Sequence, residues 1–377
     1  MAGIHNISYA VVAAAVDDIV QADDVVQAND VYYYYNFTCE QMELHIPEYI
    51  NSYLRIIKVV APLILVLISV IGILGNATVL FIIYWYNDMR SVTNFFIGNL
   101  ATTDITFLVI CTIPTAAVYM GWSPNSFMCK GMNYMMFVTV QATILTLTAM
   151  SIDRYQLVVH AVRSRNTRTT KKVLLLDVSA WIVSFLIYIP IPIYSYSMPS
   201  GCTHECKLEF PEEFQRRLFI TGSFLMLYAF PLLVILACYF KILIQVWRKK
   251  SCGTESAQAQ ERSIRRKRKI TRMVFIVVLL FAVCWAPNHI VIMLETFWPS
   301  DEFYRSIEMF KIATSLKLFS LCLSYSNSCC NPIVYAFATD SFKKHFKRIV
   351  GFCQKTEFNS VSTNVTPRED SSPETVI

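Results

Sequence analysis

A charged side chain lies inside one of the most apolar stretches of this chain. Asp104 is the only charged residue of the run Phe95–Tyr119. A carboxylate in the middle of a membrane is expensive to bury, so by default it indicates a functional site. We expect it to hold a small cation such as sodium with nearby hydroxyl and amide groups; the alternative is a protonated Asp104 satisfied by one neighbour. The residues expected to converge on it are Asn76, Thr143, Asn327, Ser328 and Asn331.

A second group of residues has the chemistry of a conformational switch. Asp153-Arg154-Tyr155 ends the third apolar run, and a guanidinium that Asp153 holds in one state and releases in another can switch without covalent chemistry. Pro287 should kink its helix beside the bulky Trp285. Pro332, in Asn331-Pro332-Ile-Val-Tyr335, frees backbone groups that lipid cannot satisfy, so its segment must pack inside a bundle. The alternatives are a surface ion pair at Asp153 and simple packing of Trp285.

Seven apolar runs carry these residues. The chain of 377 residues is 55% hydrophobic and only 16% charged, whereas soluble domains have roughly a quarter charged residues. Each run reaches the ~20 residues that a bilayer crossing needs. We therefore predict an all-α fold, a bundle of seven transmembrane helices. The runs are about Val59–Tyr84, Phe95–Tyr119, Gly131–Ile152, Val173–Tyr194, Leu218–Phe240, Met273–Leu294 and Ile312–Ala338.

The charge of the connecting segments predicts the orientation. Basic clusters at 163–172, 248–272 and 343–348 follow the third, fifth and seventh runs, so the positive-inside rule makes all three cytoplasmic. The N-terminus is then extracellular, the C-terminus is cytoplasmic, and we expect the plasma membrane. The outer segments are acidic and would concentrate cationic ligands, unless their charge serves only solubility. Because the net charge of +6 comes mostly from the inner face, no nucleic acid partner is expected.

Four regions follow from this orientation. Residues 1–58 form an acidic, glycosylated extracellular tail, 59–340 the seven-helix domain, 341–353 a short amphipathic helix on the inner leaflet, and 354–377 a disordered cytoplasmic tail. The tail hydroxyls are candidate phosphorylation sites. The modification and docking candidates are Asn6 and Asn36 for glycosylation, Cys353 for palmitoylation (or an unmodified cysteine), and Thr375–Ile377 for a PDZ domain.

The motifs, taken in order, resemble those of class A, rhodopsin-like G-protein-coupled receptors across roughly Val59–Phe352. Within that family the local strings resemble the kisspeptin, galanin and allatostatin-A receptor branch. Val140–Arg154 is close to the third helix of kisspeptin receptors, and Leu323–Pro332 is similar to both kisspeptin and galanin receptors. Met136 departs from the glutamine usual in kisspeptin receptors, and it lacks the carboxylate that aminergic receptors need. Tyr325 stands where opsins carry the retinal lysine.

The resemblance implies that an extracellular neuropeptide with a basic or amidated C-terminus binds and a heterotrimeric G protein responds. It implies a disulfide from Cys129 to Cys206, with Cys202 as the alternative. The expected ligand-binding residues, chosen by helical facing, are Asn133, Met136, Phe137, Asn288, His289, Ile292, Glu295 and Lys317. The expected activation residues are Asp153, Arg154, Tyr155, Ile144, Pro231, Tyr239, Phe281, Trp285, Pro287, Asn331, Pro332 and Tyr335.

The main alternative from another class is a membrane transporter or channel. Such proteins usually show internal repeats with paired broken helices, and we see no repeat between the two halves of the sequence. An intramembrane enzyme is disfavoured because His204-Glu205 lacks the second histidine of a zinc motif. We expect no cofactor apart from the sodium ion, and no other metal.

Overall fold

The structure is a computed structural model that describes residues 48–200, 203–248, 255–298, 307–338 and 340–349. Several predicted features lie outside these residues. They are the glycosylation sites Asn6 and Asn36, Cys202, Cys353, the tail 354–377 and its terminal Thr375–Ile377.

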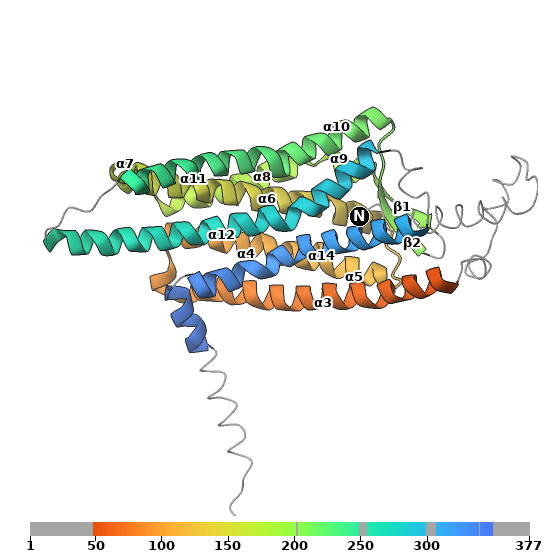
Figure 1. Ribbon diagram of the computed structural model, residues 1–377, viewed down its shortest axis with the longest axis horizontal. Helices are drawn as coiled ribbons and strands as arrows, with labels where there is room; N and C mark the ends of the chain where they lie inside the picture. The colour runs from red at the N-terminus through yellow and green to blue at the C-terminus, as the bar shows by residue number, and fades with distance from the viewer. Residues whose placement is uncertain (1–47, 201–202, 249–254, 299–306, 339, 350–377) are drawn as a thin grey trace, which may run out of the picture.

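Long helices packed side by side form the body of the molecule (Figure 1). Short helices η2 (Asn87–Met89) and α7 (Ala161–Thr167) lie between them. The seven predicted spans correspond to α3 (Glu48–Trp85); α4 (Val92–Phe107), η3 (Leu108–Thr112) and α5 (Ile113–Tyr119); α6 (Ser126–Val159); α8 (Thr170–Ile187) and α9 (Pro190–Tyr194); α10 (Glu213–Phe224), η4 (Leu225–Ala229) and α11 (Phe230–Arg248); α12 (Glu255–Phe297); and α14 (Ile307–Ala338).

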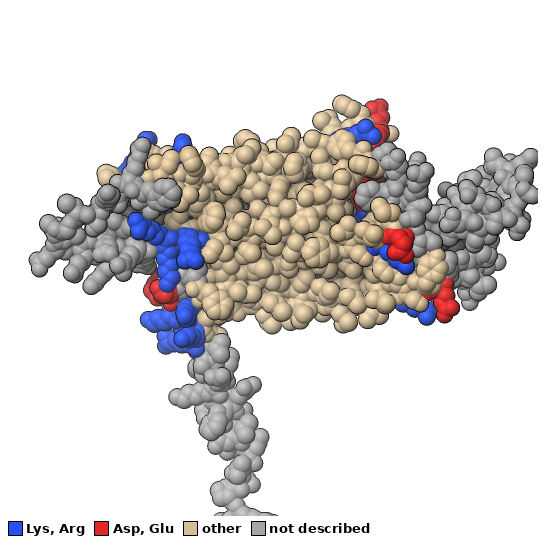
Figure 2. Space-filling model, viewed as in Figure 1, with Lys and Arg blue, Asp and Glu red and all other residues tan. Residues whose placement is uncertain are grey.

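The flank of the bundle is apolar. Within the described residues, 6 helical segments are long and apolar enough to cross a membrane, while the asparagines and serines of α14 lower the hydropathy of the seventh. Large apolar side chains face outward along the spans, such as Leu63, Leu67 and Leu74 of α3. Figure 2 shows this flank as a broad belt almost without charge, with Lys and Arg gathered at the end where α7 lies. The protein therefore crosses a membrane several times.

Two spans contain a π-helical turn close to a proline. Leu108–Thr112 precedes Pro114, and Leu225–Ala229 precedes Pro231, one of the expected activation residues. Proline removes a backbone N–H, and a π turn shifts the register of the helical hydrogen bonds around it. These turns were not predicted, because the hydrophobic pattern of the sequence continues through them.

Asn76 compensates for the backbone defect that Pro332 creates in α14. Proline 332 has no N–H, so the carbonyl of Ser328, four residues earlier, loses its helical donor. The side-chain Nδ2 of Asn76 in α3 donates to that carbonyl at 2.8 Å and to the Gly72 carbonyl at 2.9 Å. Asn76 is fully buried. The predicted packing of this segment inside a bundle is thus present, with Asn76 bound to backbone and not to Asp104.

A two-stranded antiparallel hairpin lies at the opposite end of the bundle from α7 (Figure 1). Strand β1 (Ser195–Ser200) pairs with β2 (Thr203–Leu208), with Ser195 opposite Leu208 and Ser197 opposite Cys206. The sequence analysis did not predict this sheet. Its strands are short and mostly polar, and a polar loop between two spans gives little strand signal.

Residues 340–349 are helical and turn away from the bundle axis beyond α14 (Figure 1). Phe342 is buried against the bundle, whereas Lys343, Lys344 and Lys347 are exposed, as expected of an amphipathic helix. Residues 350–353 of the predicted helix lie outside the described residues. His345 Nε2 lies 3.0 Å from Asp88 Oδ2, and this contact lowers the pKa of the Asp88 carboxyl.

Candidate functional site

A cavity of about 300 Å³ opens beneath the hairpin, at the end of the bundle opposite α7. Seven of the eight predicted ligand-binding residues line it: Asn133, Met136, Phe137, Asn288, Ile292, Glu295 and Lys317. The lining also includes Cys206, which was expected only as a disulfide partner, and residues that were not predicted from the sequence. Among the latter are Tyr119, Leu208, Phe210, Arg216 and Phe219.

An ion pair is the most polar feature of this cavity. Lys317 Nζ of α14 contacts Glu295 Oε1 of α12, and their side chains are 9% and 29% exposed. A lysine at that exposure needs a partner, because burying an unpaired charge is costly. Asn133 Nδ2 donates to Ser195 Oγ of the hairpin at 3.2 Å. This bond joins α6, which lines the cavity, to the hairpin above it. The cavity can therefore receive an amphipathic ligand whose charged group replaces one member of the pair.

His289 is the one predicted lining residue that the cavity does not include. Its ring packs 4.9 Å from that of Tyr228, 5.7 Å from that of Phe224 and 6.2 Å from that of Trp285. His289 is 8% exposed. One residue along α12 from Asn288 turns the side chain away from the cavity, towards α10 and η4. Choosing residues by helical facing alone did not resolve this difference.

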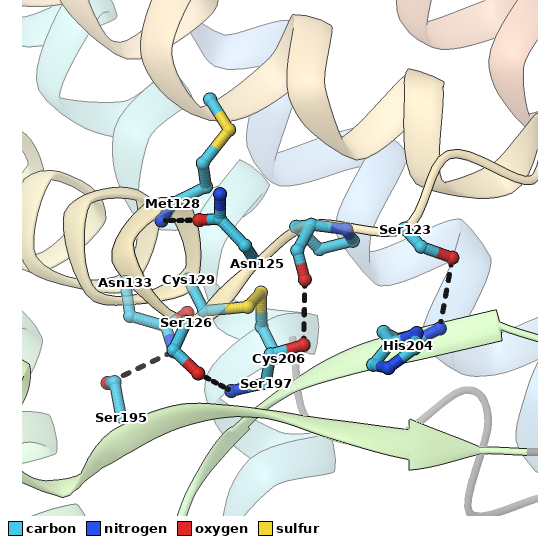
Figure 3. The surroundings of a disulfide bond; sticks show 11 residues. Ser123, Asn125, Ser126, Met128, Cys129, Asn133, Ser195, Ser197, His204 and Cys206 are labelled. Carbon is cyan, nitrogen blue, oxygen red and sulfur yellow. Dashed lines mark hydrogen bonds between the residues drawn. A yellow bond between two sulfur atoms is a disulfide. The ribbon is translucent and has the colours of Figure 1, made fainter.

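The hairpin is tied to the start of α6 by the disulfide Cys129–Cys206 (Figure 3). This is the pairing that the resemblance favours over Cys202. Two hydrogen bonds, each 3.2 Å long, also hold the hairpin in place. The backbone N–H of Ser197 donates to Ser126 Oγ, and the backbone N–H of His204 donates to Ser123 Oγ. Since β2 also lines the cavity, these bonds fix its outer wall.

A small space lies beside Trp285, which is part of its lining. Its volume is about 10 Å³, close to what one water molecule needs, and its lining includes Asp104, Thr143, Asn327 and Ser328. Asn331, also expected at the sodium site, donates from Nδ2 to Asp104 Oδ2 at 2.8 Å. The structure therefore brings Asn331 together with these four residues, whereas Asn76, which was expected there too, binds backbone carbonyls instead. A carboxylate with hydroxyl and amide oxygens is the donor set that small hard cations prefer.

Aromatic rings line the same small space. Trp285 lies 5.9 Å from Phe281 and 6.1 Å from Phe107, measured between ring centroids, and Phe107 lies 4.9 Å from Tyr325. Ile144 is fully buried in the same core. Because packed rings cannot deform continuously, a shift of α12 must rearrange this cluster in steps.

Arg154 lies near the end of α6 that leads to α7. It is 1% exposed, its Nη2 lies 3.0 Å from Asp153 Oδ2, and it also donates to Thr93 Oγ1. The predicted Asp153–Arg154 contact is present, and a second arginine shares the carboxylate. Arg168 donates from Nε to Asp153 Oδ1 at 2.5 Å and from Nη2 to Oδ2 at 2.8 Å. The sequence analysis placed Arg168 only in a basic loop, since no local spacing links it to Asp153.

Three more predicted switch residues, Tyr239, Tyr335 and Tyr155, lie towards the α7 end of the bundle, and Pro287 lies within α12. Tyr239 is buried and its hydroxyl donates to the Thr271 carbonyl of α12 at 3.5 Å. Tyr335 is fully buried with its ring 5.9 Å from that of Phe342, and Tyr155 is within 3.2 Å of His160 through its hydroxyl.

An ion pair joins α12 to the short terminal helix at the same end. Lys269 Nζ lies 2.5 Å from Asp340 Oδ1, which lowers the pKa of the Asp340 carboxyl. Both partners are exposed, so the pair adds little stability, and an outward movement of α12 would break it.

The sequence comparisons agree with this geometry. Residues 75–335 match the family model described as 7 transmembrane receptor (rhodopsin family). The chain is 37% identical to G-protein coupled receptor 54 of Oreochromis niloticus, over 78% of this chain and 79% of that protein. It is 37% identical to the KiSS-1 receptor of Homo sapiens, over 76% and 73%. It is 32% identical to the Allatostatin-A receptor of Bombyx mori, over 78% and 81%.

Proposed function

Because this chain belongs to the rhodopsin family of seven-transmembrane receptors, we propose that it binds an extracellular neuropeptide and activates a heterotrimeric G protein. Members of this family are receptors and not enzymes, and membership replaces the transporter or channel alternative. The names of the relatives support a kisspeptin-like ligand first, with allatostatin-A-like and galanin-like peptides as alternatives at 32% and 31% identity.

The Glu295–Lys317 ion pair carries the proposal for the ligand's chemistry. It lies in the wall of an otherwise largely apolar cavity and joins α12 to α14. A peptide with an arginine close to an amidated aromatic C-terminus can place its guanidinium on Glu295 and displace Lys317. Its aromatic ring then packs among apolar residues such as Met136, Phe137 and Ile292. An amide terminus adds no negative charge that would compete with Glu295.

Activation is a shift between two populations, which requires tighter peptide contacts in the active state. Displacing Lys317 releases one tie between α12 and α14 above Trp285. The rings around Trp285 repack, and α12 moves at Pro287. At the inner end this breaks the Tyr239 contact with Thr271 and the Lys269–Asp340 pair. Arg154 leaves Asp153 and, with Tyr239 and Tyr335, lines the cleft in which the G protein docks.

The same proposal gives the orientation and the further partners. The end that carries α7 faces the cytoplasm of the plasma membrane, so the N-terminus is extracellular and the C-terminus cytoplasmic. Asn6 and Asn36 would then carry sugar, and Cys353 a palmitoyl group. The tail would recruit receptor kinases and arrestin, and Thr375–Ile377 a PDZ domain. Sodium at Asp104 would stabilise the inactive state.

A peptide screen tests the function. The full chain is expressed in mammalian cells and challenged with amidated Arg-Phe peptides, galanin-like peptides and allatostatin-A-like peptides. Calcium and cyclic AMP are read in parallel. We expect a nanomolar response to one class and its loss in Arg154→Ala. Silence across all three classes, with surface expression confirmed, would overturn the proposed ligand branch.

A further inference from the structure

A second, larger cavity lies at the end of the molecule that carries α7, opposite the cavity beneath the hairpin (Figure 1). Its volume is about 660 Å³, and it is bounded by α4, α6, α7 and α8. It shares no lining residue with the cavity beneath the hairpin. Neither the ligand nor the ion of the proposed function uses it.

The lining divides into a basic and an apolar part. The basic part holds Arg163, Arg168 and Lys172, with His160 beside them, against the single carboxylate of Asp153. Three cationic side chains and one carboxylate give this part a net charge of +2 without the histidine. A site of this charge favours an anion that carries more than one negative charge.

The apolar part faces the membrane. Phe96, Ile152, Val173 and Leu176 line it, and Ile152 and Leu176 are 37% and 51% exposed. Both lie within helical segments long and apolar enough to cross the bilayer. The cavity therefore joins an apolar wall at the membrane boundary to a cationic wall just beyond it. A glycerophospholipid has this order of groups, whereas a soluble anion would use only the cationic wall.

Arg168 connects this cavity to the switch at Arg154. Its Nε and Nη2 bind Asp153, and Nη2 also donates to Thr93 Oγ1 at 2.9 Å. Its Nη1 carries two further N–H donors. An anion in the cavity can thus bind Arg168 without first breaking its contact with Asp153, and Arg and Lys heads together suit a phosphate ligand.

We propose that this cavity binds the multiply phosphorylated headgroup of an inner-leaflet phosphoinositide. Arg163, Arg168 and Lys172 bind the phosphates, while the exposed Ile152 and Leu176 contact the glycerol and the first acyl carbons. The proposal rests on the cytoplasmic orientation proposed above. Lipid binding to the purified protein needs neither peptide nor G protein, so its failure would leave the proposed receptor function untouched, and the reverse also holds.

The test uses the full purified chain in neutral phosphatidylcholine nanodiscs. Binding is titrated with phosphatidylinositol bisphosphate, phosphatidylserine and soluble inositol trisphosphate. The variant is Arg163→Gln with Lys172→Gln. Its matched control is Lys171→Gln with Lys347→Gln. Both lysines are exposed and do not line the cavity, and replacing them removes the same amount of charge. Both proteins are first checked for an unchanged melting temperature.

We expect the bisphosphate lipid to bind well above phosphatidylserine and inositol trisphosphate. The cavity variant should weaken this binding roughly 30-fold, from ~1 kcal/mol for each basic side chain near an anionic headgroup, and the control pair less than about threefold. Equal losses in both variants would show a diffuse surface attraction and overturn the site. Binding of inositol trisphosphate as tight as that of the lipid, or of phosphatidylserine as tight as that of the bisphosphate, would also overturn it. Lys172→Gln against Lys171→Gln repeats the comparison with single, adjacent substitutions.

Discussion

Replacing Asn76 with alanine should destabilise the bundle by about 2 kcal/mol, and replacing Pro332 as well should remove most of that effect. Interhelical side-chain hydrogen bonds in membrane proteins contribute only ~0.6 kcal/mol on average. A buried acceptor left without any donor costs more, about 1–3 kcal/mol. The Ser328 carbonyl falls in the second class because Pro332 has no N–H to offer it, and Asn76 donates to it at 2.8 Å.

The double variant separates this explanation from simple loss of packing. In Pro332→Ala the new backbone N–H can bind the Ser328 carbonyl, so Asn76→Ala should then cost only about 0.6 kcal/mol. The two substitutions should therefore couple by more than ~1 kcal/mol. Thr78→Ala is a matched control in the same helix, because its hydroxyl is exposed and binds only the Leu74 carbonyl of α3 at 2.7 Å. We expect it to change stability by less than ~0.5 kcal/mol.

Thermal unfolding of the purified protein in detergent, followed by tryptophan fluorescence, measures these differences. Domains of about 150–250 residues lose roughly 2–4 °C in Tm for each kcal/mol of stability lost. This chain is larger, so we use the lower end of that range and expect a loss of about 2 kcal/mol to lower Tm by about 4 °C. Unfolding that proves irreversible is compared at one scan rate. An equal loss from Asn76→Ala with and without Pro332 would refute the reasoning, since the bond would then not compensate for the proline.

Three further predictions concern the cavity beneath the hairpin, the small space at Asp104 and the disulfide that holds the hairpin. Glu295→Gln should lower the potency of an Arg-containing peptide about tenfold, because a charge-assisted hydrogen bond contributes ~1.5–3 kcal/mol and this side chain is partly exposed, with dose–response curves as the assay. Asp104→Asn should abolish the effect of sodium on agonist binding, measured by competition in sodium and in N-methylglucamine buffers. Cys129→Ser should destabilise the chain by ~4 kcal/mol through the loop that it frees, and weaken agonist binding, measured by thermal unfolding and by competition.

Each of these predictions has its own contradicting result. A citrulline-containing peptide should lose potency on the native chain but no further potency on Glu295→Gln, and an additive loss would exclude a direct contact. Persistent sodium sensitivity in Asp104→Asn would move the cation elsewhere. If Cys129→Ser bound peptide normally, the hairpin would have no part in forming the cavity.

The spans and the switch motifs were predictable because both depend on local sequence. Runs of about twenty apolar residues set the helices, and the Asp153-Arg154-Tyr155 and Asn331-Pro332 strings sit at fixed places on them. Five of the six residues expected at the sodium site also converge, and Asn76 is the exception. Each faces the bundle interior because lipid offers a polar side chain no partner, and this constrains them to one place.

Features that depend on partners far along the chain were not predictable. Arg168 binds Asp153, from which α7 separates it in the sequence. Asn76 binds the Ser328 carbonyl, which lies 252 positions further along the chain. Neither spacing repeats in a periodic pattern. The π turns and the β1–β2 hairpin were missed because a single added residue in a helix, or a short polar strand, leaves no hydropathy signal. His289 follows Asn288, which lines the cavity, and a shift of one position along the helix is enough to turn its side chain out of the lining.

Nucleotide exchange measured with purified components tests the central claim most directly. The chain is reconstituted in nanodiscs with purified heterotrimeric G proteins, and GTP analogue uptake is followed with and without the peptide class found active in cells. The account predicts peptide-dependent acceleration of exchange, lost in Arg154→Ala while peptide binding is retained. Peptide binding with no acceleration for any G-protein class, or acceleration that survives in Arg154→Ala, would contradict it.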